Sequence, residues 1–252
     1  MILGLEFPPV SHLIEWPTIF GSGVWAVNKV VLLMWLAVVL VAGFYLVAGS
    51  RQQLVPRGVQ NVAEAVVDFI REGIVHQTIG PDGTAYIPFL LTLFSFILVL
   101  NLYEVIPLIQ MPVTARMALP AFMSLLVWVV FNFVGMKKQG VLGYFKNMMF
   151  PPGVPVFLYI LVAPIELVST VIVRPLSLAV RLFANLLAGH LILVSFAVLG
   201  TALWESTYIG AALPGALLVA LTGFEVLVSA LQAYIFTILA AVYIGGALHP
   251  EH

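Results

Sequence analysis

Charged residues are scarce in this sequence of 252 residues. Asp, Glu, Lys and Arg together make up 8% of it, and hydrophobic residues make up 62%. Soluble globular domains carry about 25% charged and about 45–50% apolar residues, so this chain lacks the charge needed to cover a water-soluble globule. The composition therefore predicts an integral membrane protein. Its 10 basic and 11 acidic residues nearly balance, so no excess of charge points to a nucleic-acid partner.

Cysteine is absent, which excludes disulfides, thiolate metal sites and cysteine nucleophiles. The sequence also lacks a glycine-rich phosphate loop, a metal-ligand cluster and a nucleophile elbow. We therefore expect no cofactor, no metal and no catalysis by this chain alone. The first basic residue is Lys29, so the N-terminal stretch lacks the basic region of a signal or transit peptide. The apolar segments are expected to be permanent spans.

Long apolar runs dominate what is present. Five runs are long enough to cross a hydrocarbon core of about 30 Å. They cover residues 24–48, 86–109, 120–136, 154–200 and 208–248. The last two are too long for a simple span, since a continuous helix over 154–200 would measure about 70 Å. We expect two steeply tilted helices, the first of them kinked near Pro175.

The other segments complete an all-α polytopic membrane protein with a single membrane domain. Residues 1–23 contain three prolines and two carboxylates and predict an outer-side N-terminal segment that does not span. Residues 56–77 place apolar side chains on one helical face and charged ones on the other, as in an amphipathic helix at the membrane interface. The runs 86–109 and 120–136 predict a helical hairpin.

Basic residues predict the orientation, because they gather in cytoplasmic loops. Six of them fall on one side in this topology: Arg51, Arg57, Arg71, Lys137, Lys138 and Lys146. The last three mark a basic loop after the hairpin. Only Lys29 and Arg116 fall on the other side. The N-terminus is expected outside and the C-terminus in the cytoplasm.

Polar residues interrupt both long tracts. An arginine at the bilayer centre costs roughly 2.5–3.5 kcal/mol on insertion scales. At 100° per residue, one stripe of the first tract contains Arg174, Leu178, Arg181, Asn185, Ala188 and Gly189. The small residues at 184, 188 and 189 leave room for another helix to approach. A second stripe, in the last tract, contains Thr222, Glu225, Ser229 and Gln232. Ionisable groups inside the membrane predict an ion or proton pathway.

Each of these residues also has a structural interpretation. Arg174 could extend its charge to the interface, and His190 could be a satisfied packing residue. Ser229 could bond to its own helix. Arg181 and Glu225 could form an ion pair that joins two helices.

Three further polar residues are less clear from the sequence. Asn101 and Glu104 lie at the end of a predicted span, where an interfacial role and a proton relay are equally plausible. Glu166 lies deep in a span, so it must be paired, hydrated or neutral.

Two motifs resemble subunit a of F-type ATP synthases, the stator of the proton channel. They are "RPLSLAVRLFANLLAGH" at 174–190 and "LQAYIFTILAAVYIGGALHPEH" at 231–252. The resemblance covers nearly the whole chain. It implies that Arg181 faces the ring of c subunits and its membrane-embedded carboxylate, with Asn185 and Gln232 as polar neighbours.

The resemblance also implies two aqueous half-channels. His190 and Glu225 match a pair that lines the outer one, so we expect them within hydrogen-bond or one-water reach of each other. Glu166 matches the acid of the inner one. It lies nine residues before Pro175, one more than in other members, and a π-bulge would absorb the extra residue.

The partners implied are the c-ring, b-type peripheral stalk subunits and the lipid bilayer. The "RLFAN" stretch and the lack of a targeting segment favour a bacterial plasma membrane over the mitochondrial inner membrane. A proton-coupled secondary transporter is the alternative function, but it would show inverted repeats and broken helices. A purely structural membrane subunit would not need Arg181.

Overall fold

The fold was obtained as a computed structural model that describes residues 18–21, 26–50, 53–106, 109–150, 155–206 and 208–249. Five helices in this described part are long and apolar enough to cross a membrane. They are Lys29–Ser50, Pro81–Leu102, Ala118–Gln139, Tyr159–Trp204 and Gly210–Leu248. The prediction of an all-α polytopic membrane protein is therefore confirmed. Most of the expected N-terminal segment 1–23 lies outside the described residues.

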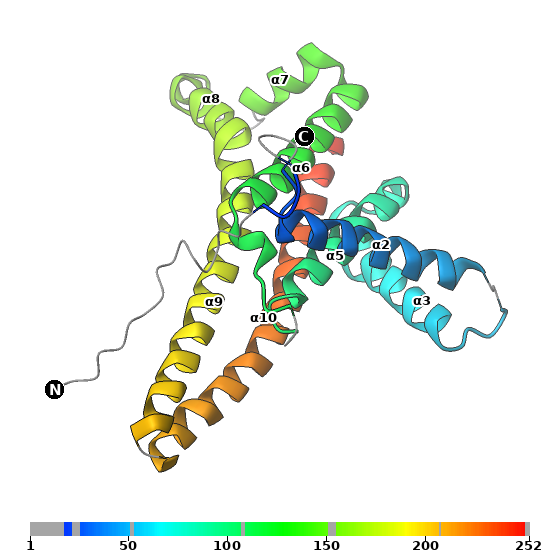
Figure 1. Cartoon of the computed structure of the whole chain (residues 1–252). Helices are drawn as coiled ribbons and strands as arrows, with labels where there is room; N and C mark the ends of the chain where they lie inside the picture. Colours follow the sequence, from blue (N-terminus) through cyan, green and yellow to red (C-terminus); the bar gives the residue numbers. More distant parts are fainter. Residues whose placement is uncertain are drawn as a thin grey trace. The chain divides into compact units, whose positions relative to one another are not determined.

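Figure 1 shows the helices in chain order. The long ones are α2 (Lys29–Ser50), α5 (Ile87–Leu102), α6 (Ala118–Gln139), α9 (Arg174–Ser206) and α10 (Tyr208–Leu248). The shorter α-helices are α3 (Val59–Ile70), α4 (His76–Thr78), α7 (Val141–Met149) and α8 (Tyr159–Val168). The π-helices are η2 (Arg71–Val75) and η6 (Ser169–Val173), and the 3-10 helices are η3 (Pro81–Tyr86), η4 (Val113–Ala115) and η5 (Val156–Leu158).

Several expected helix boundaries differ from the observed ones, and two of these differences have a physical explanation. The basic stretch after the hairpin is not a plain loop, because α6 continues to Gln139 and α7 follows Gly140. Gly140 adopts a φ of +75°, which a residue with a side chain rarely adopts, and so ends α6 and starts a new helix direction. The first long helix reaches Ser206 and not position 200, because residues 201–206 include no proline or glycine that would end it.

The irregular turn in the first long helix lies just before Pro175 and not at it. In η6 the N–H of Arg174 donates to the carbonyl of Ser169, five residues back. The same register would pair position 175 with the carbonyl of Thr170, but proline has no N–H. Trp128 Nε1 donates to that carbonyl at 3.0 Å instead. The π-segment also lies between Glu166 and Pro175, where the extra residue predicts it.

The described residues form two compact units, each built from segments far apart in sequence. The first unit takes its described residues from Met1–Val41, Phe96–Arg116 and Leu182–Ala233. The second takes its described residues from Ala42–Ser95, Met117–Arg181 and Tyr234–His252. Both units therefore contain parts of α2, α5, α9 and α10.

Within the first unit, the end of α9 and the start of α10 form an antiparallel helical hairpin, the yellow and orange ribbons of Figure 1. Leu182 and Leu186 of α9 are buried. Lys29 Nζ donates to the carbonyl of Ile109 at 3.2 Å, which ties the start of α2 to the segment after α5.

Within the second unit, aromatic rings join helices that are distant in sequence. The ring of Phe69 in α3 lies 5.8 Å from that of Phe94 in α5 and 5.7 Å from that of Tyr234 in α10. A Cβ at Gly245 of α10 would lie 2.6 Å from the carbonyl oxygen of Thr78. Only glycine allows so close an approach to that backbone.

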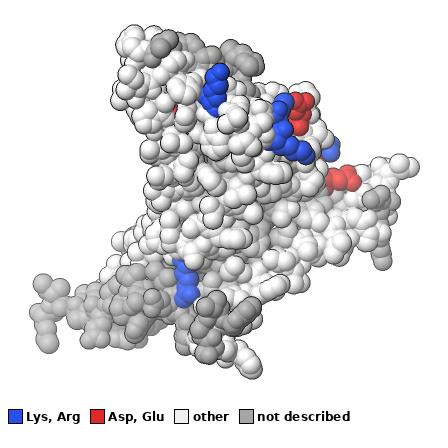
Figure 2. Space-filling view, turned by 90° about the horizontal axis from the view of Figure 1, so that it is seen from above, with Lys and Arg blue, Asp and Glu red and all other residues white. Residues whose placement is uncertain are grey.

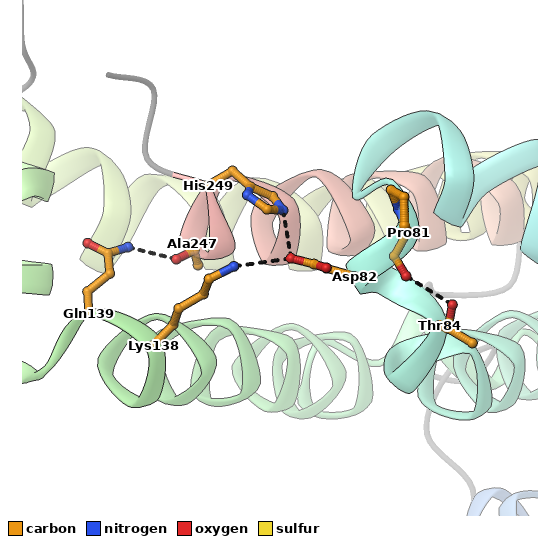
Figure 3. Close-up of polar contacts among 7 residues, drawn as sticks. All are labelled: Pro81, Asp82, Thr84, Lys138, Gln139, Ala247 and His249. Carbon is orange, nitrogen blue, oxygen red and sulfur yellow. Dashed lines mark hydrogen bonds and ion pairs between the residues drawn. The ribbon is translucent and has the colours of Figure 1, made fainter.

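Polar contacts hold the end of α10 in the same unit (Figure 3). Gln139 Nε2 donates to the carbonyl of Ala247 at 2.8 Å. Asp82 Oδ2 lies 3.2 Å from Lys138 Nζ and 3.6 Å from His249 Nε2. One exposed carboxylate thus serves two basic side chains from separate helical ends.

Candidate functional site

A buried carboxylate and a histidine meet in the first unit. His190 Nδ1 of α9 lies 3.6 Å from Glu104 Oε1, in the turn after α5. Their side chains are 11% and 1% exposed. A distance of 3.6 Å suits an ion pair but is longer than a hydrogen bond, and neither carboxylate oxygen of Glu104 has a hydrogen-bond partner among the described residues. A buried carboxylate in this state must be ion-paired, protonated or hydrated.

The turn that presents Glu104 is itself polar. Asn101, at the end of α5, is fully buried, and its Oδ1 accepts a hydrogen bond of 3.2 Å from Thr114 Oγ1. Its amide nitrogen has no partner among the described atoms. Asn101 and Glu104 are thus two buried polar residues within one short stretch, where the chain leaves α5.

Glu225 of α10 belongs to the same unit and is buried. A Cβ built on Gly189 would lie 2.5–2.7 Å from the carboxylate atoms of Glu225, so the carboxylate packs directly against the backbone of α9. Glu104 and Glu225 are thus both buried in this unit, and a buried carboxylate must be paired, protonated or hydrated.

One polar bridge continues the cluster along the hairpin. Asn185 Nδ2 of α9 donates to Gln232 Oε1 of α10 at 3.5 Å, the outer limit for a hydrogen bond. Ser229 and Gln232 are buried, and Gln232 Nε2 has no partner in the described part of the chain. Three buried polar groups of α10 thus lie on the face predicted from their spacing: Glu225, Ser229 and Gln232.

Arg181 belongs to the second unit and is exposed. Exposed positions recur along α9 at a spacing of three or four residues, at Ser177, Arg181, Ala184 and Ala188. Gly189 does not join this exposed stripe, because it is buried against Glu225. No described carboxylate of the second unit forms an ion pair with Arg181.

Arg174 and Glu166 also belong to the second unit. The guanidinium carbon of Arg174 lies 5.4 Å from the centroid of the Tyr243 ring, a cation–π distance. Glu166 of α8 is half-buried, three residues before η6.

The structure groups some of the predicted residues in a way the sequence did not specify. His190 was paired with Glu225, whereas its observed ion-pair partner is Glu104; a direct pairing of His190 with Glu225 stays a prediction. Thr114 was not singled out. The sequence signal closest to this site is the position of Asn101 and Glu104 just past an apolar run, where two polar residues follow a span.

Comparisons with known proteins identify the family of this chain. The sequence model of one protein family, described as ATP synthase A chain, matches residues 31–245. ATP synthase subunit a of Frankia alni is 41% identical over 252 residues, which cover 97% of this chain and 87% of the relative. The subunit a of Rhodococcus erythropolis is 39% identical and covers 98% and 89%, and that of a Methylobacterium species is 42% identical and covers 90% and 89%. The described part of the chain contains five membrane-length helices, and the match covers nearly the full length, so the chain belongs to the ATP synthase A chain family, known as subunit a in these bacterial relatives.

Proposed function

We propose that this chain conducts protons through two aqueous half-channels, and that Arg181 separates them while facing a carboxylate of the c-ring. As a member of its family, the chain is a non-catalytic, proton-conducting stator subunit of the F-type ATP synthase membrane sector. One observation carries the role of Arg181: a permanent cation is exposed on a long apolar helix, flanked by small residues. Such a cation requires an anionic partner from outside the chain, since hydrocarbon offers none.

The chemistry of arginine suits this position. An opposite charge within about 4–6 Å lowers the pKa of a carboxyl group, so Arg181 would favour the ionised rotor carboxylate and release its proton. The guanidinium keeps its own protons, because its pKa lies above 12. It therefore blocks direct leakage between the half-channels. Each proton that crosses gains about 2.3 kcal/mol per 100 mV of membrane potential, which drives rotation.

The cluster of Glu104, His190 and Glu225 is proposed to line the outer half-channel. With the N-terminus outside, α5 runs outward and ends beside Glu104, while His190 lies in the outward half of the long span Tyr159–Trp204. A histidine side chain can change its charge near neutral pH. A carboxylate that makes no hydrogen bonds can take up or release a proton without breaking a hydrogen bond. Asn101 and Ser229 would supply polar groups for water along the path.

Glu166 is proposed as the acid of the inner half-channel, with Arg174 beside it as a second cation. Both precede Arg181 along the same long helix, on the side that faces the cytoplasm in this orientation. Asn185 and Gln232 would be polar neighbours of Arg181 on the way to the outer cluster.

The orientation and the partners are proposed on the same grounds. Basic residues place the C-terminus in the cytoplasm. The chain is proposed to lie in a bacterial plasma membrane, given its bacterial relatives. Its partners would be the c-ring, through the exposed stripe of α9, and the b-type peripheral stalk subunits.

Reconstitution tests this proposal directly. Vesicles would contain the chain with its stalk partners, either with or without the c-ring, and an internal pH dye would report proton entry under an imposed potential. Flux is expected only when the c-ring is present. An equal flux without the c-ring, or flux that carries a solute with it, would contradict the stator assignment and favour a transporter.

A further inference from the structure

We propose that the corner formed by the end of α6 and the helix α7 is a binding surface for anionic phospholipid headgroups. The last turn of α6 carries Lys137 and Lys138, and α7 carries Lys146. Because α6 is one of the membrane-length helices, its terminal lysines lie where a span meets the headgroups. The proposal goes beyond proton conduction and does not depend on it.

The apolar side of α7 lacks any covering partner in the described structure. Val141, Leu142 and Phe145 are 57%, 88% and 39% exposed. At 100° per residue these three side chains lie within one sector of the helix, with Lys146 at its edge. A short helix with an exposed apolar sector flanked by lysine is typical of segments that lie in the membrane interface.

The fold holds this sector in place, because the opposite side of α7 is locked onto α6. Tyr144 is buried, and a Cβ on Gly135 would lie 2.3 Å from its ring, so the ring rests on the glycine backbone. Tyr144 Oη donates to Asn132 Oδ1 at 3.0 Å. Burial raises the pKa of Tyr144, against a smaller opposing effect of the Arg174 charge, so the hydroxyl keeps the proton that it donates. The helix is thus attached by one face and presents the other.

The positive charge at the end of α6 and on α7 favours an anionic headgroup over a zwitterionic one. Lys138 is paired with Asp82 at 3.2 Å, but no described carboxylate pairs with Lys137 or Lys146. Much of the face in Figure 2 is uncharged, with basic side chains in a few patches. Two uncompensated cations beside exposed apolar side chains complement a lipid with a negative headgroup and apolar tails. A zwitterionic lipid would satisfy only the apolar part.

A single-site quenching experiment tests this surface in the assembled complex. The chain contains no cysteine, so Leu142→Cys introduces one fluorophore site on this subunit, in a complex whose other subunits carry no reactive cysteine. The complex would be reconstituted in phosphatidylcholine vesicles that contain headgroup-spin-labelled phosphatidylglycerol or phosphatidylcholine. Quenching by phosphatidylglycerol is expected to be the stronger, by about five-fold for each lysine that contributes.

Removal of the two uncompensated charges should abolish the preference. Lys137→Gln with Lys146→Gln is expected to bring quenching by the two lipids to parity, and high salt should do the same in the wild type. Arg57→Gln with Arg71→Gln removes two basic side chains elsewhere and should leave the preference intact. Equal quenching in the wild type, or a preference that survives the double lysine change, would overturn the proposal. Protection from both quenchers would also overturn it, since another protein subunit would then cover the surface.

Discussion

Two histidine–carboxylate pairs in this chain have the same separation but opposite surroundings. His190 and Glu104 lie 3.6 Å apart in the first unit, with side chains 11% and 1% exposed. His249 and Asp82 lie 3.6 Å apart in the second unit, with side chains 52% and 57% exposed. In the first pair, neither oxygen of the carboxylate has a hydrogen-bond partner among the described residues, whereas Asp82 has a second basic partner in Lys138.

This difference separates the proposed proton-transfer site from a surface contact. Water screens the charges of an exposed pair, so such a pair contributes only about 0–1 kcal/mol to stability. Burial makes each unpaired charge costly, so the gain or loss of one proton changes the energy of a buried pair much more than that of an exposed pair. The separation of the two groups therefore does not distinguish the pairs. Their burial and the lack of hydrogen bonds to the carboxylate do distinguish them.

The largest effect is expected from Arg181. This residue tests the contrast between buried and exposed pairs, because it is exposed and is still proposed to act in proton transfer. Arg181→Ala should abolish ATP synthesis driven by a proton gradient while the complex still assembles. Arg181→Lys should also fail, since a compact ammonium cannot replace the planar guanidinium. Synthesis rates in membrane vesicles check this, with Arg57→Ala as the control at another exposed arginine. Synthesis at the wild-type rate in Arg181→Ala would remove the proposed role.

The next effect concerns the buried pair. Glu104→Gln or His190→Leu should lower proton flux by about a hundred-fold, as is typical for the loss of one positioned proton-transfer group. The residual flux should follow a different pH profile, because another group takes up the proton. Dye-based flux measurements between about pH 6 and pH 8 cover the range in which histidine titrates. His249→Leu is the matched change in the exposed pair and should leave flux unchanged.

Exchanging the histidine and the glutamate between α9 and α10 makes this test more specific. The variant His190→Glu with Glu225→His should recover more flux than the poorer of its two single changes, if the cluster needs an acid and a base but not a fixed helix for each. Normal flux and a normal pH profile in every single variant would show that these residues only pack.

A smaller effect is expected from Gly189, which lies beneath the Glu225 carboxylate. A Cβ there would come within 2.5 Å of Glu225 Oε1, so Gly189→Ala must displace the carboxylate and should slow proton flux several-fold. Gly223→Ala is the control on α10, because nothing lies within 4 Å of a Cβ at that position. That control should leave proton flux unchanged and stability equal or slightly higher, since alanine is more favourable than glycine inside a helix by about 1 kcal/mol. Equal flux in both variants would show that the close contact is irrelevant.

The smallest effect is expected at the exposed pair itself. Asp82→Asn removes the partner of both Lys138 and His249, yet it should lower the free energy of unfolding by no more than about 1 kcal/mol and leave proton flux intact. Thermal unfolding of the purified complex, in low and high salt, measures this loss. High salt should reduce the difference between variant and wild type, because screening weakens the same contact. A large loss of flux would mean that exposure does not distinguish the two pairs.

Local sequence information was sufficient for the membrane-length helices and for the shared face of three buried polar residues. The apolar runs predicted every membrane-length helix, because the cost of burying polar groups in lipid depends on contiguous residues. The spacing of Glu225, Ser229 and Gln232 predicted their shared face, since an α-helix repeats every 3.6 residues. The boundaries were less certain: a basic loop was expected where α7 folds back onto α6, and that fold requires Tyr144 to meet Gly135.

By itself, the sequence determined the membrane class and the five long helices of the described part, and it singled out Arg181 as the candidate for the proposed role, because each of these depends on composition, on periodicity within one segment or on a motif of adjacent residues. Only the tertiary structure decided that His190 meets Glu104, that Gly189 accommodates Glu225 and that Trp128 takes the carbonyl left free by Pro175. Each of these contacts joins residues that are distant in sequence. They depend on how the chain reverses between helices and on which small residues let two backbones approach, and no local pattern contains that information.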